Sequence, residues 1–160
     1  VLLALDATLV ARSGNGERRI PATTFFLGAF ETALAAGELL TEIVIQPASD
    51  VLGSAYRKLS QPASGYSIVG VAAVVGKTDG KISTANIGIT GVGDVAYRAT
   101  AVESAFIGSD GSAAAIAAAA AHAADGQTVA GDIHADRAYR AQMATVYVRR
   151  AIEGALEALG

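Results

Sequence analysis

Two tyrosines and a lysine lie around a short polar loop in the middle of the sequence. Tyr56 and Lys58 precede the loop S-Q-P-A-S-G at residues 60–65, and Tyr66 follows it directly. Loops that are positioned by a rigid strand commonly carry binding residues. A tyrosine ring can stack on a flat ring, and a lysine ammonium can bind an anion. The spacing therefore indicates a site for a planar, anionic ligand, with Lys58 at its charged edge.

The same residues also have an ordinary structural interpretation. Lysine is seldom buried without an anionic partner, so Lys58 is either a ligand contact or a solvated lysine at a sheet edge. Tyrosines at strand ends are commonly half-buried packing residues. Arg140, near the start of the last predicted helix, is either a solvated arginine or one that pairs with an acid of a partner subunit. The residues alone thus indicate a binding edge but no reaction.

Other reactive side chains do not form a recognisable catalytic or metal-binding pattern. His122 and His134 are twelve residues apart and have no ligand pattern around them. Ser60 and Ser64 have no histidine within a known nucleophile motif. The run G-I-T-G-V-G at 88–93 does not open a helix after a strand, so it does not predict a dinucleotide-binding loop.

The composition narrows the class of protein. A chain of 160 residues with 52% hydrophobic content is long enough for one domain with a core. The net charge of −3, without a basic patch, predicts no nucleic-acid partner, and the absence of cysteine excludes thiolate metal sites on this sequence. No segment has the length and hydrophobicity of a membrane span, so we expect a cytoplasmic protein. The chain begins at Val1 and its only methionine is Met143, so we expect a fragment or a processed product.

Alternating and continuous apolar runs predict strands in the first part of the chain. Residues 1–10 and 17–20 form a predicted hairpin around the turn at 13–16, and residues 21–38 are expected to connect it to the next strand. Four further strands are predicted, and the run 66–75 is apolar enough to be buried on both faces. Short links between them favour one antiparallel sheet. The four predicted strands are 39–47, 51–59, 66–76 and 81–93.

Helical spacing of apolar residues dominates the rest of the chain. Helices are predicted at 97–107, 112–124 and 137–159, and Asp132 or Asp136 is positioned to cap the last one. Strands followed by helices are typical of an α+β fold. We therefore expect an antiparallel sheet of three to four strands packed against three helices, preceded by a hairpin.

Several segments resemble one protein family in their order along the chain. R-R-I-P-A-T-T-F-F-L-G (18–28), G-E-L-L-T-E-I-V-I-Q-P (37–47) and Y-R-K-L-S…G-Y-S-I-V-G-V-A-A (56–73) are similar to the FAD-binding medium subunit of molybdenum hydroxylases. This is the group of carbon monoxide dehydrogenase and xanthine dehydrogenase. The end of the chain, 132–152, resembles the closing helix of that subunit. The joint match is more specific than any single motif.

The resemblance implies a domain division and a cofactor. Residues 1–28 resemble the C-terminal end of the FAD-binding domain, which makes the hairpin a remnant of that domain. Residues 29–160 resemble the flavoprotein C-terminal domain. In the family, a molybdopterin large subunit passes electrons to an iron–sulfur small subunit. FAD then passes these electrons from the small subunit to NAD or another acceptor. The glycine-rich loops that hold the FAD pyrophosphate in the family are absent from this sequence, so we expect the isolated chain to be inactive.

The resemblance also implies cofactor contacts. Lys58 matches a lysine that contacts the flavin, Leu40 matches an apolar contact on an earlier strand, and Tyr66 matches a tyrosine at the flavin edge. Around the position of Tyr66 the family commonly has the sequence Gly-Asp-Tyr, whereas in this chain Gly65 precedes Tyr66 directly. This departure affects the geometry expected for the loop.

Two other functions are compatible with the residues. The chain could be a cofactor-free interaction module that docks the iron–sulfur and molybdopterin subunits, or an unrelated small-molecule-binding α+β domain. Pairing of the hairpin at residues 1–20 with a second copy, through an open strand edge, would give a homodimer. A yellow preparation favours the flavin-binding function, because bound flavin absorbs visible light.

Overall fold

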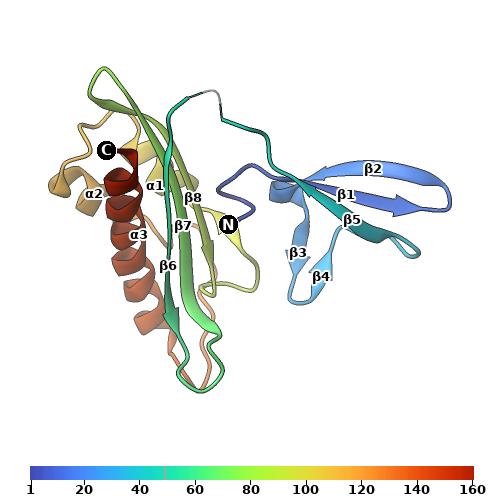
Figure 1. Ribbon diagram of the computed structural model, residues 1–160. Helices are drawn as coiled ribbons and strands as arrows, with labels where there is room; N and C mark the ends of the chain where they lie inside the picture. The colour runs from blue at the N-terminus through green and yellow to red at the C-terminus, as the bar shows by residue number, and fades with distance from the viewer. Residues whose placement is uncertain (49) are drawn as a thin grey trace.

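A computed structural model describes residues 1–48 and 50–160 of the chain. It contains three antiparallel sheets and three α-helices (Figure 1). The strands are β1 (Thr8–Ser13), β2 (Gly16–Pro21), β3 (Phe26–Gly28), β4 (Glu31–Thr32), β5 (Leu39–Val44), β6 (Gly53–Ser60), β7 (Ser67–Thr78), β8 (Lys81–Thr90) and β9 (Tyr97–Arg98). The helices are α1 (Thr100–Phe106), α2 (Ala113–Ala120) and α3 (Arg137–Leu159), with a short 3-10 turn at Ala22–Thr24.

The larger sheet has the strand order β6-β7-β8-β9 and carries the main core. β7 is its central strand, and nine consecutive residues of it are buried, Ile68–Gly76. α3 lies along β6 and β7, and α1 packs near β8, so the helices cover one face of the sheet (Figure 1). The predicted α+β fold, with an antiparallel sheet packed against three helices, is confirmed.

The N-terminal strands form a separate sheet with the order β2-β1-β5, which projects away from the helix-covered sheet (Figure 1). The predicted hairpin is present as β1 and β2, joined at Ser13 and Gly16. The prediction that residues 39–47 belong to the C-terminal sheet is wrong, because β5 pairs with β1 instead. Alternation of apolar and polar residues identifies a strand, but it does not identify the neighbour that the strand bonds to. β9 takes the fourth place in the larger sheet.

The first six residues do not form the strand that was predicted for residues 1–10. They form turns, and Asp6 has a left-handed backbone with φ of 46°. Ala4 packs with Ala72 and Val74 on the sheet face opposite the helices. A Cβ on Gly88 would lie 3.3 Å from the backbone nitrogen of Ala4, so a small residue on β8 permits this close approach. The segment therefore covers part of the open face before β1 begins.

The last helix has the boundaries that the sequence predicts. Asp136 caps it, because its side chain accepts a hydrogen bond from the Tyr139 backbone N–H at 2.7 Å. The buried stripe of α3 includes Ala144, Val148 and Ile152, which pack on the sheet. Within residues 1–48 and 50–160, no helix combines the length and the hydrophobicity needed to cross a membrane.

Candidate functional site

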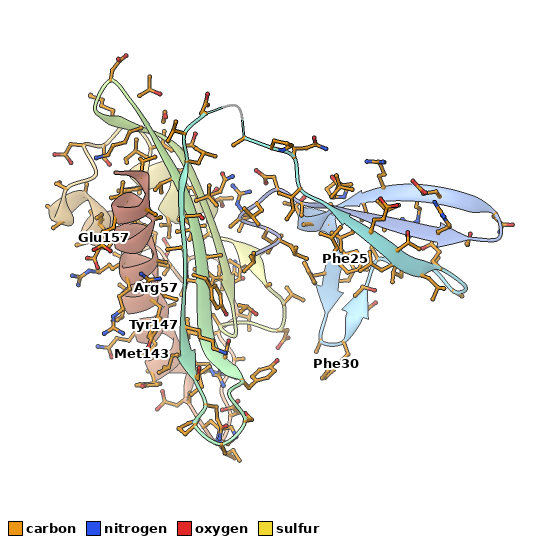
Figure 2. The ribbon with its side chains drawn as sticks, viewed as in Figure 1. Phe25, Phe30, Arg57, Met143, Tyr147 and Glu157 are labelled. Carbon is orange, nitrogen blue, oxygen red and sulfur yellow. The ribbon has the colours of Figure 1, made fainter. Side chains whose placement is uncertain are left out.

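Strand β6 separates its side chains between two environments. Ala55 and Leu59 pack against the core beneath α3, and Arg57 points toward that helix (Figure 2). Tyr56 and Lys58 alternate with them and are exposed. Because successive residues of a strand point to opposite faces, these two side chains lie on the face that the helices leave open. The structure therefore brings Tyr56 and Lys58 onto one surface.

The turn between β6 and β7 presents Tyr66 at the end of this surface. Gly65 has a left-handed backbone with φ of 70°, which glycine adopts without a steric penalty. The side-chain carbonyl of Gln61 accepts hydrogen bonds from the backbone N–H and hydroxyl of Ser64, at 2.5 and 2.7 Å. The Tyr66 side chain is 77% exposed, so its ring is available to a ligand.

Lys58 contacts the same turn. Its ammonium donates a hydrogen bond to the Gly65 carbonyl oxygen at 3.1 Å. Among the residues that the structure describes, Lys58 forms no ion pair. An ammonium group has three donors, so at least two remain available for an anionic or electron-rich ligand edge. Lys58 and Tyr66 thus lie near the same turn at one end of the sheet.

Arg140 anchors the ends of the strands behind the Tyr66 turn. It is 6% exposed and donates to the carbonyl oxygens of Ile68 and Gly91, at 2.8 and 2.7 Å, and to the Asp132 carboxylate at 2.5 Å. A hydrogen bond from the His134 backbone N–H lowers the pKa of Asp132, and Arg140 adds to that effect. The interpretation of Arg140 as a solvated arginine is therefore wrong, and its acidic partner in this structure is Asp132 of the same chain.

Leu40 lies apart from the other two predicted contacts. It is on β5, in the three-stranded sheet, and is 39% exposed. A shallow surface hollow at this position is lined by Leu40 and the next three residues of β5, 41–43. Lys58 is on β6 of the larger sheet, and Tyr66 lies in the turn that joins β6 to β7 (Figure 1). The structure thus brings two of the three predicted residues together and leaves Leu40 on a different surface.

An apolar cleft of about 210 Å³ lies between the N-terminal segment and the open face of the larger sheet. Leu2, Leu3 and Phe26 line it on one side, and Tyr56 and Gly70 line it on the other. A Cβ on Gly70 would lie 2.6 Å from the Tyr56 hydroxyl oxygen, so only glycine leaves room for this ring position. The cleft shows that residues from both parts of the chain meet beside Tyr56.

These residues fit one edge of a flavin ring. A flat heteroaromatic ring needs apolar or aromatic surface on its faces and a donor or cation at its electron-rich edge. Tyr56 and Tyr66 offer exposed aromatic rings, and Lys58 offers the cation. The sequence contains no glycine-rich loop that opens a helix and would bind a pyrophosphate. The described residues therefore fit part of an FAD site and not its phosphate-binding part.

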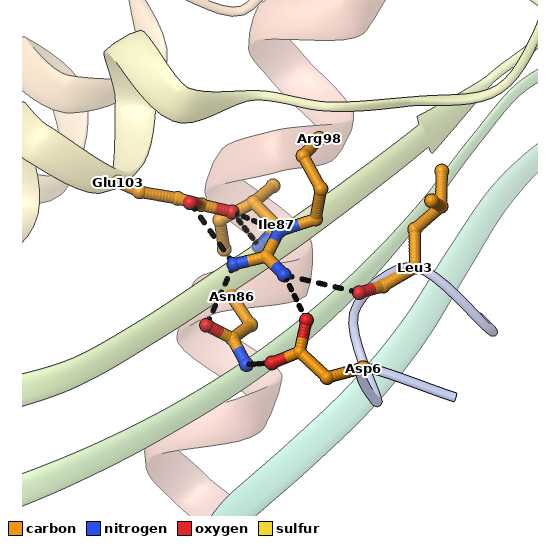
Figure 3. Close-up of polar contacts among 6 residues, drawn as sticks. All are labelled: Leu3, Asp6, Asn86, Ile87, Arg98 and Glu103. Carbon is orange, nitrogen blue, oxygen red and sulfur yellow. Dashed lines mark hydrogen bonds and ion pairs between the residues drawn. The ribbon is translucent and has the colours of Figure 1, made fainter. Parts of the chain in front are cut away.

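One polar network could not be found from the sequence. Arg98 on β9 binds Asp6, Asn86 and Glu103, which are separated from it by 92, 12 and 5 positions (Figure 3). The only part of this network that the local sequence suggests is the pair Arg98 and Glu103, because Arg98 ends β9 and Glu103 lies in α1, which begins two residues later. The contact with Asp6 depends on how the N-terminal segment folds back onto the sheet.

Comparison with known protein families identifies the chain as part of a flavoprotein. The chain belongs to the CO dehydrogenase flavoprotein C-terminal domain family, which it matches over residues 54–155. Residues 1–48 match a second family, the FAD binding domain in molybdopterin dehydrogenase. The predicted resemblance to the FAD-binding medium subunit of molybdenum hydroxylases is confirmed.

Particular relatives agree with this assignment. The chain is 36% identical, over 98% of its length, to the 6-hydroxypseudooxynicotine dehydrogenase complex subunit alpha of Paenarthrobacter nicotinovorans. It is 32% identical, over 96% of its length, to the carbon monoxide dehydrogenase medium chain of Hydrogenophaga pseudoflava. It covers 53% of each of these relatives, so the chain spans about half the length of the curated relatives it matches.

Solved structures show the same fold. A chain of carbon monoxide dehydrogenase from Hydrogenophaga pseudoflava superposes with a TM-score of 0.92 and 34% identity. The match covers 98% of the present chain and 54% of that chain. A chain of quinoline 2-oxidoreductase from Pseudomonas putida 86 gives a TM-score of 0.89 and 28% identity, and 55% of it is covered. The overall fold is therefore shared with these two proteins.

Proposed function

We propose that this chain is part of the flavoprotein subunit of a molybdenum hydroxylase and helps to hold FAD. The observation that carries the proposal is the succession of two family matches, an FAD-binding domain at 1–48 and a flavoprotein C-terminal domain at 54–155. The exposed surface of Tyr56, Lys58 and Tyr66 supports it, because it offers aromatic rings and a cation near one another. In the intact enzyme this subunit acts as an FAD-dependent oxidoreductase component.

Each residue has a distinct part in this proposal. Bound FAD supplies the chemistry by which electrons pass from iron–sulfur clusters to an acceptor. The Lys58 ammonium stabilises negative charge at the ring edge, and its hydrogen bond to Gly65 holds it in place. Tyr66 covers part of the ring with its exposed side chain. Leu40 supplies an apolar contact from β5, which requires the cofactor to reach both sheets.

The partners, location and domain division complete the proposal. The partners are an iron–sulfur small subunit and a molybdopterin large subunit, and the complex is cytoplasmic. For the domains, residues 1–28 would belong to the FAD-binding domain and residues 29–160 to the C-terminal domain. The pairing of β5 with β1 supports a division further along the chain, after β5.

A titration of FAD onto the full-length subunit tests the flavin site. We expect Lys58→Ala to weaken FAD binding roughly tenfold, because a hydrogen bond to a charged group is typically worth one order of magnitude or more. Lys81→Ala is the matched control: it removes an exposed lysine from the opposite end of the sheet, at the β7–β8 hairpin. Flavin fluorescence and the visible absorption spectrum measure binding.

The outcomes separate the alternatives. Loss of affinity in Lys58→Ala but not in Lys81→Ala supports the proposed role of Lys58. Equal FAD affinities in both variants and in wild type would mean that Lys58 is not part of the flavin site, but they would not contradict the assignment to a flavoprotein. A full-length subunit that binds no FAD but co-purifies with its partner subunits would instead favour the cofactor-free docking module.

A further inference from the structure

Arg98 joins the N-terminal part of the chain (residues 1–44) to the C-terminal part (residues 53–160). Its Nη1 donates to the Leu3 carbonyl oxygen at 3.2 Å and to Asp6 Oδ1 at 2.5 Å (Figure 3). Asp6 Oδ2 in turn accepts a hydrogen bond from Asn86 Nδ2 at 3.0 Å. Among the residues that the structure describes, the Arg98–Asp6 pair is the only ion pair between the two parts.

The C-terminal part holds the guanidinium of Arg98 in a fixed orientation. Glu103 accepts from Nε and Nη2 at 2.6 and 3.1 Å, and Asn86 Oδ1 accepts from Nη2 at 2.7 Å. Glu103 is only 8% exposed, and its Oε1 also accepts the Ile87 backbone N–H at 2.7 Å. A planar group bound on two sides has little freedom to turn, so Nη1 is aimed at the N-terminal segment before that segment binds.

In the N-terminal part, the residue that binds Arg98, Asp6, lies at a bend in the chain. Asp6 lies between the segment that covers the larger sheet and the start of β1 at Thr8. Its φ of 46° is a left-handed conformation that aspartate tolerates better than most residues. The junction also has apolar contacts: Ala4 packs with Ala72 and Val74, and Ala96 packs against the N-terminal cluster that contains Leu3. Apolar burial is non-directional, whereas the hydrogen bonds of Arg98 require one particular geometry.

Rotation at this bend would change the surroundings of the candidate flavin surface. Phe26, which lies beyond the bend, lines the apolar cleft together with Tyr56 and Gly70 of the larger sheet. The walls of the cleft come from the two parts of the chain that Arg98 connects. The same rotation would move β5 relative to the strand that carries Lys58, since β5 belongs to the N-terminal sheet.

We propose that Arg98 is a positioning residue for the flavin site. By binding Leu3 and Asp6, it fixes the orientation of the FAD-binding-domain portion against the sheet that carries Lys58. Arg98 does not contact the cofactor in this proposal, and it acts only through the junction. The inference rests on the proposed function for its consequence on FAD, but the fixed orientation can be measured separately.

The test uses the full-length subunit with Asp6→Asn, Arg98→Gln and the double variant. We expect each single variant to weaken FAD binding roughly fivefold, which corresponds to about 1 kcal/mol. The double variant should bind FAD no more weakly than Arg98→Gln alone, because both changes remove one shared contact. Glu17→Gln is the control, since it removes a comparable ion pair, Arg12–Glu17 at 2.7 Å, within the N-terminal sheet.

A second measurement reports orientation without flavin. Spin labels on introduced cysteines at Asn15 and Glu157 give the distance between the β1–β2 turn and the end of α3, and this sequence has no cysteine of its own to compete. Any cysteine elsewhere in the full-length subunit is replaced first. We expect a single narrow distance distribution in wild type and in Glu17→Gln. The distribution should broaden in Asp6→Asn and Arg98→Gln.

Each result decides for or against the inference. Unchanged label distances and unchanged FAD affinity in Asp6→Asn would overturn it, as would losses of affinity that simply add in the double variant. If Arg98→Gln fails to fold, Asp6→Asn still decides, because the Asp6 side chain is 61% exposed and its loss leaves the core intact. If wild type binds no FAD, the proposed function fails, while the label distances still test the positioning role.

Discussion

The Lys58 ammonium lies 3.1 Å from the Gly65 carbonyl oxygen, so a side chain of β6 binds the turn that precedes Tyr66. This contact gives Lys58 two roles in the proposed site: it carries the positive charge and it supports the turn. The two roles can be separated by a change to the turn that leaves the lysine in place.

Gly65→Ala should disturb the turn and weaken FAD binding in the full-length subunit. Gly65 has a φ of 70°, and a residue with a Cβ pays about 1–2 kcal/mol in that conformation. We expect the Tyr66 ring to be displaced and the affinity for FAD to fall, while Lys58 is unchanged. Gly14→Ala is the control, because Gly14 lies in an exposed turn with open space around its Cβ position. Equal affinity in the two variants would show that the shape of the turn does not matter to the cofactor.

Arg140→Lys should destabilise the protein even though it keeps the charge. Arg140 binds two carbonyl oxygens and the Asp132 carboxylate, and a single ammonium cannot reach the same three partners in that geometry. The loss leaves buried carbonyl groups without a donor, which costs about 2–3 kcal/mol. Urea unfolding measures the change. Arg149→Lys, at an exposed position of the same helix, should leave the urea midpoint within experimental error.

Gly53→Ala should be one of the most damaging small substitutions in the chain. A Cβ at this position on β6 would overlap the Ala155 carbonyl oxygen and lie 2.8 Å from the Leu159 backbone nitrogen. Both neighbours are backbone atoms of α3, so the helix has to move away from the sheet at a cost of about 3 kcal/mol. Gly154→Ala is the comparison, because its Cβ would meet chiefly the flexible end of Arg57, and the nearest other atom, the Ala55 Cβ, would lie 3.2 Å away. A midpoint for Gly53→Ala equal to that of Gly154→Ala would contradict this account.

Features that depend on one segment could be predicted from the sequence. β7 is recognisable because an unbroken apolar run of that length is typical of a buried strand, and nine of its residues are buried. α3 is recognisable because its apolar stripe follows the helical period and Asp136 provides a cap. The exposed positions of Lys58 and Tyr66 follow from their place around a polar loop. These properties require no knowledge of the rest of the chain.

Features that depend on distant pairing could not be predicted. β5 alternates like any half-exposed strand, and its partner β1 lies about thirty positions earlier. Arg140 looks like a surface residue by its spacing, but it is buried because it binds carbonyl groups at the start of β7 and just after β8. The Asp6–Arg98 pair spans 92 positions and requires the N-terminal segment to turn back onto the sheet. In each case a tertiary contact, rather than local propensity, determines the outcome.

The Arg18–Glu38 ion pair should make stability depend on pH in the acid range. Arg18 donates to both oxygens of Glu38 at 2.7 Å, and the Ala35 backbone N–H adds a third hydrogen bond at 2.7 Å. The bond from Arg18 is the main reason that the pKa of Glu38 is lowered from 4.5 to about 2, with the Ala35 N–H adding to it.

Because the pKa of Glu38 is lower in the folded state than in the unfolded state, its contribution to stability is present in full above about pH 5 and is lost as the pH falls toward 2. Glu38→Gln should therefore lower the urea midpoint at pH 7, and the difference from wild type should shrink steadily between pH 5 and pH 2. Glu42→Gln removes the same charge from an exposed position on β5 and corrects for general charge effects. A difference between Glu38→Gln and wild type that stays constant down to pH 2.5 would mean that the ion pair does not stabilise the fold.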